Sequence, residues 1–484
     1  MTVSRLLSLF GLVALHCTPV LTRSIGTRVA NQCESTRYEA QPRVFICTDM
    51  SNEPDDQMSL VRFLTYANEF DIQGIAGVTS VWKNDSIDIS TIHTVISAYG
   101  NITGNLNANV PSSASYPPAS DLLAKVYPGH AVYGLAALDL EPSDAAKALV
   151  KSVDGASINK PQWTLMWGGA AVLAEALSYV SKSRDAAAVA DFVRKLRVYS
   201  ISDQDDAGSW IRDTYPSLFY IVSLHGFSEY TAASWNGISG EEIRYFDQGG
   251  PDSSLVTNDW LQEHIRIGSL GQHYPRYAYI MEGDTPSFFP LIQNGLGDPE
   301  HPEWGSWGGR FKPVDAARRS NVFSDTAEWV QGLNGQFFMS SFAGIWRWRQ
   351  AYQYDFANRM QWSTQSDYSK SNHAPVVVVN GTCGPAALKV SYQFNTTVVL
   401  DASSTWDPDS DELQFDWLFY KDVTYRLEAN ISTVDSYMTI DKLNPTGSMV
   451  RVSTFDDNEM HVILSVTDPH NMTTYRRIIL EPTS

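Results

Sequence analysis

Apolar residues in the first three quarters of the chain alternate between short runs and longer segments with helical period. A short run typical of a strand comes first in each unit, and an amphipathic helical pattern follows it. These pairs lie at 44–47 and 55–70, 72–80 and 86–100, 163–167 and 168–180, and 196–202 and 205–215. Strands that alternate with helices at this spacing predict βαβ units around a mostly parallel sheet.

The last hundred or so residues follow a different pattern. After the polar stretch SDYSKSNHAP, short β-rich runs are separated by turn residues, with no helical period between them. The runs are VVVV, TTVVLDASS, LQFDWLFY, MVRVSTF, MHVILSV and TYRRIIL. This pattern predicts a seven-strand β-sandwich. We therefore expect an α/β domain over residues 40–370 and an all-β domain over residues 372–484.

The chain begins with the layout of a secretory signal peptide, which we expect to span residues 1–22. Arg5 precedes an apolar stretch from Leu6 to Leu15, and small or polar residues follow. That stretch is too short to span a bilayer. Six Asn-x-Ser/Thr sequons agree with a secreted, extracellular glycoprotein. They are Asn84, Asn101, Asn380, Asn395, Asn430 and Asn471.

The charge of the chain narrows the choice of partner. The net charge is −19, which argues against nucleic acid or an anionic membrane. The chain also has 14 Trp and 23 Tyr. Exposed aromatic rings beside acids are typical of sites that stack on sugar rings, although packing in a core is the alternative for each of them.

Three cysteines remain once the signal is removed, so one of them is left without a partner. Cys47 lies at the end of an apolar run, whereas Cys33 and Cys383 lie in polar segments. We therefore expect a disulfide between Cys33 and Cys383 and a reduced, buried Cys47.

The first apolar run leads into CTDMSNEPDDQ, which places four carboxylates in eleven positions: Asp49, Glu53, Asp55 and Asp56. Ligands of parallel sheets bind outside the carboxyl ends of the strands, which is where this segment falls. Carboxylates this close repel one another unless some are protonated or a cation binds, and Ca²⁺ prefers such oxygen ligands. The alternative is that the acids cap the following helix, but one cap explains one acid.

The segment VFICTDMSNEPDDQMSLVRFL resembles the opening of the nucleoside hydrolases, whose signature DxDPGxDDxxAL follows the first strand. The whole chain is similar to secreted nucleoside-hydrolase-like proteins described as cellulose-binding, which add a C-terminal immunoglobulin-like domain. TDMSNEPDDQMSLVRFL, EGDTPSF and HPEWGSWGGRF carry this resemblance. LDASSTWDPDSDELQFDWLFY resembles polycystic-kidney-disease and cadherin-like domains, in which a turn like Asp407-Pro408-Asp409 joins two strands and a residue like Trp417 fills the core.

The resemblance implies a calcium site and a catalytic base. With two residues inserted in the loop, Asp49 matches the aspartate that ligates calcium and activates water. Without the insertion, Asp49 matches the first signature aspartate, and Ser51 stands in place of the catalytic one. We prefer the insertion, because it keeps the strand directly before the motif. The family's proline-glycine turn is replaced by SNEP.

The resemblance also implies the other ligands. It assigns Asp56 to calcium and Asp55 to substrate hydroxyls, and it nominates the Trp167 carbonyl at the end of a middle strand. EGDTPSF matches a late HDP segment of the family and nominates Asp284, with Gly283 in place of the histidine. That histidine lies near the leaving group in nucleoside hydrolases.

Further residues are candidates to line the pocket. Glu53 or Glu282 can protonate a leaving group, and Asn52 and Glu282 can bind substrate. Asp203, Asp205 and Asp206 either bind sugar hydroxyls or cap a helix. Trp304 and Trp307 lie in a glycine-rich loop, where they form either a sugar platform or part of the loop packing.

These features favour a calcium-dependent glycosyl hydrolase that cleaves a glycosidic or N-glycosidic bond of a carbohydrate. Retention of Asp49, Asp55, Asp56 and Asp284 favours an enzyme, since a binding module needs no centre that activates water. The alternative is a non-catalytic protein that binds cellulose or another polysaccharide. A further alternative is an extracellular nucleoside hydrolase, which loss of the histidine makes less favoured.

Overall fold

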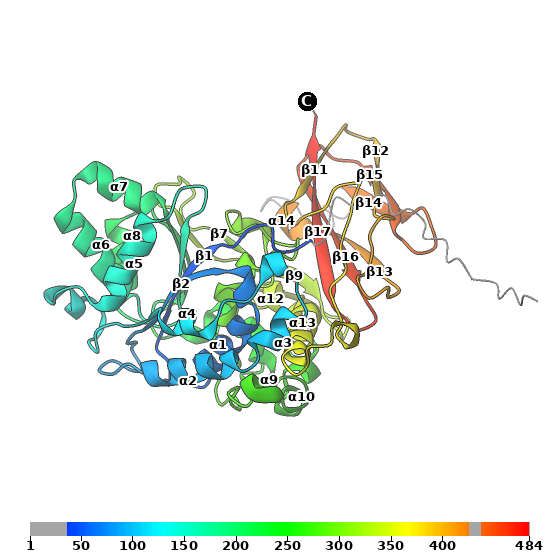
Figure 1. Ribbon diagram of the computed structural model, residues 1–484. Helices are drawn as coiled ribbons and strands as arrows, with labels where there is room; N and C mark the ends of the chain where they lie inside the picture. The colour runs from blue at the N-terminus through cyan, green and yellow to red at the C-terminus, as the bar shows by residue number, and fades with distance from the viewer. Residues whose placement is uncertain (1–35, 425–436, 484) are drawn as a thin grey trace, which may run out of the picture. The chain divides into compact units, whose positions relative to one another are not determined.

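The run VFIC forms strand β1 (Arg43–Thr48), whose side chains are buried on both faces. Val44 and Ile46 belong to the core on one face of the sheet, and Phe45 and Cys47 to the core on the other. Burial on both faces is typical of a parallel sheet covered by helices. The computed structural model describes residues 36–424 and 437–483 (Figure 1).

The expected mostly parallel sheet is confirmed. Its order is β3-β2-β1-β4-β5-β6-β8-β7, and only β7 and β8 pair antiparallel. The other strands are β2 Asp71–Gly77, β3 Val126–Pro128, β4 Gln162–Met166, β5 Leu196–Ser202, β6 Phe219–Ser223, β7 Phe311–Pro313 and β8 Val322–Asp325. Because β2 and β4 flank β1, the strand order reverses between β1 and β4, and ligands bind at such a switch point.

Helices cover both faces of this sheet. Helices α5, α6, α7 and α8 contribute to the core that includes Phe45, and α1, α2 and α13 contribute to the core that includes Val44 (Figure 1). The helices are α1 Asp55–Thr65, α2 Ile89–Gly100, α3 Thr103–Asn107, α4 Ala119–Leu123, α5 Asp144–Asp154, α6 Ala171–Ser183, α7 Ala186–Arg194, α8 Ala207–Thr214, α9 Gly240–Ile243, α10 Asn258–His264, α11 Gly268–Gly271, α12 Ala343–Trp346, α13 Arg349–Trp362 and α14 Lys421–Thr424. None of those within residues 36–424 and 437–483 is long and apolar enough to cross a membrane.

The C-terminal region forms the expected all-β structure. One sheet has the order β11-β17-β16-β13 and the other β12-β15-β14. The strands are β11 Leu388–Tyr392, β12 Thr397–Asp401, β13 Gln414–Phe419, β14 Met438–Lys442, β15 Met449–Thr454, β16 Met460–Thr467 and β17 Thr473–Pro482; a separate hairpin pairs β9 Glu328–Gln331 with β10 Phe337–Ser340.

The strands of the sandwich are not all the predicted ones. VVVV at 376–379 forms isolated bridges at its two ends, to Trp406 and Thr382, instead of a strand. Strands β11 and β14, which the pattern missed, supply the remaining positions. Each of them keeps exposed residues among its buried ones, which weakens its apolar signal.

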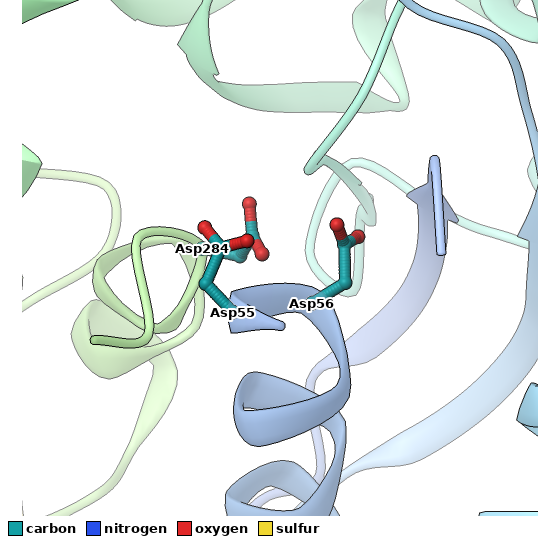
Figure 2. A group of neighbouring side chains, drawn as sticks. All are labelled: Asp55, Asp56 and Asp284. Carbon is teal, nitrogen blue, oxygen red and sulfur yellow. The ribbon is translucent and has the colours of Figure 1, made fainter. Parts of the chain in front are cut away.

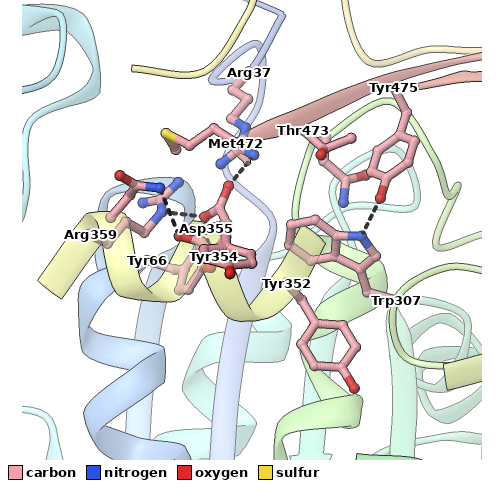
Figure 3. Close-up of polar contacts among 12 residues, drawn as sticks. Arg37, Tyr66, Trp307, Tyr352, Tyr354, Asp355, Arg359, Met472, Thr473 and Tyr475 are labelled. Atoms are coloured by element: carbon pink, nitrogen blue, oxygen red, sulfur yellow. Dashed lines mark hydrogen bonds and ion pairs between the residues drawn. The ribbon is translucent and has the colours of Figure 1, made fainter. Parts of the chain in front are cut away.

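Strand β17 packs against the α/β part through specific polar contacts. The Tyr475 amide donates to the Asn294 carbonyl at 2.8 Å, and the Arg477 amide donates to the Gly295 carbonyl at 3.0 Å. The Trp307 indole donates to the Tyr475 hydroxyl at 3.3 Å (Figure 3). Residues 35–484 form one compact unit, so the domain boundary near residue 371 stays a prediction.

Cys47 and Cys383 lie within the described residues. Cys47 is a free, buried thiol, and burial raises its pKa. Cys383 is in a disulfide. The predicted partner Cys33 and the predicted signal peptide at 1–22 lie outside the described residues.

Most of the described sequons are open to modification. Asn84, Asn101, Asn380 and Asn395 are exposed, and Asn471 is half-buried. Asn430 lies outside the described residues. Glycosylation itself stays a prediction.

Candidate functional site

A pocket that is partly open to solvent lies where β1 and β4 end. Five carboxylates line the pocket, from the loop after β1, the start of α1 and a late loop. The lining residues are Asp49, Asn52, Glu53, Asp55, Asp56, Trp82, Trp167, Ile201, Ser202, Gln204, Tyr230, Trp235, Arg244, Ile280 and Asp284.

The start of α1 brings two of these acids to the pocket. Pro54 is the residue before the helix, and it has no side-chain cap, so neither Asp55 nor Asp56 is the capping residue. Instead, Asp56 accepts a hydrogen bond from the Thr48 hydroxyl at the end of β1. Capping therefore does not explain this acidic pair.

Asp55, Asp56 and Asp284 point to one place. One carboxylate oxygen from each lies within 4.8 Å of the others (Figure 2). The family resemblance instead grouped Asp49 with Asp56 and Asp284 and directed Asp55 at substrate. Adjacent aspartates in the first helical turn both reach the cavity here, because the helix axis points at it.

Burial raises the pKa values of all these acids, and repulsion from neighbouring carboxylates adds to it for Asp55, Asp56 and Asp284. Burial is the largest cause that raises the pKa of Asp55 to about 7, and the charges of Glu53 and Asp49 add to it. Burial and the neighbouring aspartates raise the pKa values of Asp56 and Asp284 well above the usual range, and burial raises that of Asp49. The negative charge of Asp49 helps to raise the pKa values of Asp55, Asp56 and Asp284. Asp49 therefore belongs to the same electrostatic group.

The donor set fits a hard cation. Oδ2 of Asp49 and Oδ2 of Asp284 are buried and have no hydrogen-bond partner among the described residues. Unpaired buried carboxylate oxygens are unfavourable unless a positive charge offsets them. The Trp167 carbonyl accepts one hydrogen bond, from Gln204 Nε2 at 2.5 Å, and keeps a lone pair. Carboxylates and a carbonyl are ligands that Ca²⁺ prefers.

Gly283 lets the late loop approach Asp55 closely. A Cβ atom at this position would lie 2.9 Å from Oδ2 of Asp55 and 3.2 Å from the Trp235 ring. A side chain at this position would require the Asp55 carboxylate and the Trp235 ring to shift, and Trp235 occupies this side of the pocket.

The structure separates the two glutamates proposed to protonate a leaving group. Glu282 is fully buried and does not line the pocket. Its Oε2 accepts a hydrogen bond from Arg62 Nε at 2.5 Å and one from the Thr285 hydroxyl at 2.8 Å. Glu282 is thus held in a buried ion pair, which corrects its assignment to substrate. Glu53 lines the pocket and has no hydrogen bond or ion pair within the described part of the chain.

The acidic side chains after β5, those of Asp203, Asp205 and Asp206, bind other parts of the fold, which corrects their assignment to substrate. Arg212 binds Asp203 through two hydrogen bonds of 2.7 and 2.6 Å. Asp205 accepts from the amides of Ala171 and Ala207, and Asp206 accepts from the amide of Leu135. The helix-capping alternative therefore describes Asp205, and Gln204 between these acids is the residue that faces the pocket.

The glycine-rich loop lies away from the pocket, which corrects the proposed sugar platform. Trp307 is fully buried and donates to Tyr475. Trp304 stacks on His301 with ring centroids 4.0 Å apart and meets His461 edge-on. The alternative, packing of the loop, is what the structure shows.

Other aromatic side chains form the rim of the pocket. Trp82 is 59% exposed and meets Tyr230 edge-on at 6.3 Å. Trp235 donates its indole N–H to the Ser202 hydroxyl, and Arg244 lies over its ring. Sequence reasoning missed these residues, because they follow strand ends without forming a motif.

Two family models match the chain. The model described as Cellulose-binding Sde182, nucleoside hydrolase-like domain, matches residues 43–311. The model described as Cellulose-binding protein Sde0182, C-terminal domain, matches residues 397–482. A comparison with curated proteins found no match.

Solved structures include similar chains. A nucleoside hydrolase-related hypothetical protein from Saccharophagus degradans, associated with carbohydrate metabolism, is 29% identical with a TM-score of 0.73. The match covers 92% of this chain and 100% of that one. A PKD domain from the KIAA 1837 protein is 15% identical with a TM-score of 0.14, covering 20% of this chain and 82% of that one.

Proposed function

The chain belongs to the family of cellulose-binding Sde182 nucleoside hydrolase-like proteins, and we propose that it is a secreted, calcium-dependent glycosyl hydrolase that acts on a carbohydrate. The observation that carries this proposal is the pocket at the end of β1 and β4. It combines five carboxylates, two of them with unpartnered buried oxygens, with an aromatic rim. Acids that surround an ion and aromatic rings that stack on sugar are what such a reaction requires.

The ion would be held by Asp55, Asp56 and Asp284, with Asp49 and the Trp167 carbonyl beside them. When bound, a calcium ion supplies positive charge that offsets these carboxylates and polarises a water molecule. The requirement for about six to eight oxygen ligands leaves positions for water or substrate hydroxyls.

The side chains of the pocket divide the work of hydrolysis. Asp49 accepts the proton of the attacking water at its unpartnered oxygen, and Glu53 donates a proton to the leaving group. Asn52, Gln204 and Arg244 are placed to bind hydroxyls, and Trp82 and Tyr230 offer ring surfaces at the rim.

Secretion is supported by features far from the pocket. The N-terminal segment has the layout of a signal peptide, four described sequons are exposed, and Cys383 forms a disulfide. Disulfides persist mainly in oxidising compartments outside the cytosol.

A non-catalytic protein that binds cellulose or another polysaccharide is the second candidate. The family description favours it, because it names cellulose binding. A nucleoside hydrolase is a further alternative, and Gly283 argues against it, since it replaces the family's histidine.

The experiment compares hydrolysis of aryl glycosides, cello-oligosaccharides and nucleosides by the full chain in calcium chloride and in chelator. We expect release of sugar from a carbohydrate substrate, abolished by chelator and by Asp49→Ala. Glu53→Gln should lower the rate by about 10²- to 10⁴-fold, the usual contribution of a general acid. The exposed Glu263→Gln on α10 is the matched control and should hydrolyse at the native rate.

Three results discriminate among the alternatives. Binding of cello-oligosaccharides without any hydrolysis would favour the binding protein. Cleavage of nucleosides alone would favour the nucleoside hydrolase. Hydrolysis at the native rate in chelator would contradict the role of calcium.

A further inference from the structure

Arg244 is the one cationic side chain among the described residues that line the acidic pocket. It directly follows α9, and its amide donates to the Gly240 carbonyl at 2.8 Å, so the end of the helix fixes its backbone. The side chain is half-buried. Although five carboxylates line the same pocket, the guanidinium forms no ion pair or hydrogen bond within residues 36–424 and 437–483. Its charge and its N–H donors are therefore available to a ligand.

The ring of Trp235 holds the guanidinium at the wall of the pocket. The guanidinium carbon of Arg244 lies 5.9 Å from the centre of that ring. Trp235 is buried, and its indole donates to the Ser202 hydroxyl at 3.2 Å. A Cβ atom at Gly283 would lie 3.2 Å from the same ring, so Trp235 packs against the loop that carries Asp284. A fixed ring of this kind orients a guanidinium by cation–π attraction and stacking.

Other half-buried arginines that lie over a ring also bind a carboxylate. Three of them lie over Phe192, Phe219 and Tyr220, as Arg244 lies over Trp235. These three ion pairs have distances of 2.6 to 2.9 Å, and they join Arg184 to Asp154, Arg197 to Glu300 and Arg212 to Asp203. Arg244 has the same packing without the carboxylate. The position that an acid of the chain occupies in those three sites is thus open at Arg244, and it faces the pocket.

We propose that Arg244 binds an anionic substituent of the carbohydrate in this pocket, either the carboxylate of a uronic acid or a sulfate ester. The planar guanidinium presents a fork of N–H donors, which matches two oxygens of such a group, and charge-assisted bonds of this kind are strong. A neutral hydroxyl accepts one such bond and leaves the charge without a counter-ion. The proposal rests on the proposed function only in that the pocket binds a carbohydrate.

The charge of the whole chain limits the size of the ligand. The net charge of −19 repels a long polyanion. Arg244 therefore selects a short or sparsely charged acidic carbohydrate, with one anionic sugar in the pocket.

The test measures binding rather than hydrolysis. Isothermal titration of the full chain in calcium chloride compares methyl 1-thioglycosides, which resist hydrolysis and differ only at C6: a uronate, a 6-sulfate and the neutral sugar. The set includes both anomers of the gluco and galacto series. Native protein should bind a uronate or a 6-sulfate about 10- to 100-fold more tightly than the matched neutral sugar, the usual effect of a hydrogen bond to a charged group. The preferred anion identifies the substituent.

Variants at Arg244 assign the preference to this side chain. Arg244→Gln should lower the affinity for the anionic sugar to that for the neutral one, and it should change the affinity for the neutral sugar far less. The exposed Arg451→Gln on β15 is the matched control and should bind as the native protein does. If Arg244→Gln does not fold, Arg244→Lys replaces it, because it keeps the charge but loses the fork. Native affinity of Arg244→Lys for the anionic sugar would overturn the proposal.

The outcomes separate this subsite from the proposed hydrolase. A preference for the anionic sugar that Arg244→Gln removes would support the subsite even if no glycoside is hydrolysed. Equal affinity of the native protein for anionic and neutral sugars would overturn it, and so would a preference that Arg244→Gln retains, even if neutral glycosides are hydrolysed.

Discussion

Two groups of buried acids in this protein differ in their partners. Glu282 pairs with Arg62, Asp355 with Arg37 and Glu328 with Arg310. Although burial opposes it, the charges of Arg37 and Arg359 lower the pKa of Asp355. The aspartates of the pocket have no arginine partner within the described residues, and their pKa values are raised instead. The three ion-paired carboxylates hold segments of the fold together, whereas the pocket aspartates have no such partner to offset their charge.

Asp284→Asn should change thermal stability in opposite directions with and without calcium. In chelator, the variant should unfold at a higher temperature than the native protein, because it removes one of several buried groups that repel one another. When the free calcium concentration is 100 times the dissociation constant, binding should raise the free energy of unfolding of the native protein by about 2.7 kcal/mol. The free energy of unfolding of the variant should rise much less.

A thermal-shift titration measures both effects, with the exposed Asp121→Asn on α4 as control. An equal calcium shift in Asp284→Asn and native protein would remove Asp284 from the site. A lower unfolding temperature of the variant in chelator would show that Asp284 stabilises the fold by another contact.

At the scale of elements, local pattern predicted the frame of the site, and tertiary packing decided the rest. β5 covers the predicted run 196–202, because the run contains apolar residues on both faces of the strand and both faces are buried. The segment CTDMSNEPDDQ predicted the acidic loop, because it places four acids directly after the apolar run that forms β1. The roles of Glu282 and Trp307 could not be predicted, since they depend on Arg62 and Tyr475, which lie far away in the sequence.

The Arg62–Glu282 ion pair positions α1 against the loop that carries Asp284. Arg62 also donates to the Tyr352 carbonyl of α13 at 2.9 Å, so it joins three segments. Glu282→Gln leaves Arg62 buried without its counter-charge, which should lower the free energy of unfolding by about 3–5 kcal/mol. Arg62→Met/Glu282→Gln removes both charges and should be more stable than Glu282→Gln alone.

Urea denaturation measures the coupling between the two side chains. It compares the native protein with Glu282→Gln, Arg62→Met and the double variant. Native stability of Glu282→Gln combined with loss of hydrolysis would reinstate Glu282 as a catalytic acid.

At the scale of the whole molecule, Arg477 of β17 binds the sandwich to the α/β part. The guanidinium is buried, and it donates to the carbonyls of Leu296 at 2.7 Å, Trp304 at 3.0 Å and Gly305 at 3.1 Å. Burial lowers its pKa to about 10. Trp307 and Tyr475 join the same two parts, and Figure 3 shows this hydrogen bond together with the ion pair of Arg37 and Asp355.

Arg477→Ala should therefore destabilise the full chain. The change leaves several buried carbonyls without donors, at about 1–3 kcal/mol for each unsatisfied group. The exposed Arg451→Ala on β15 is the matched control and should change stability by less than about 0.5 kcal/mol. We expect a single unfolding transition by calorimetry, shifted down in Arg477→Ala. Two separate transitions, of which only one responds to Arg477→Ala, would show that the two parts unfold independently.

A crystal structure of the full chain soaked in calcium chloride tests whether the acidic pocket is a metal-dependent catalytic centre. We expect an ion bound by Asp55, Asp56 and Asp284, with at least one coordination position open toward Asp49 and Glu53. An ion enclosed entirely by protein ligands, or no ion in this pocket at a saturating calcium concentration, would contradict it.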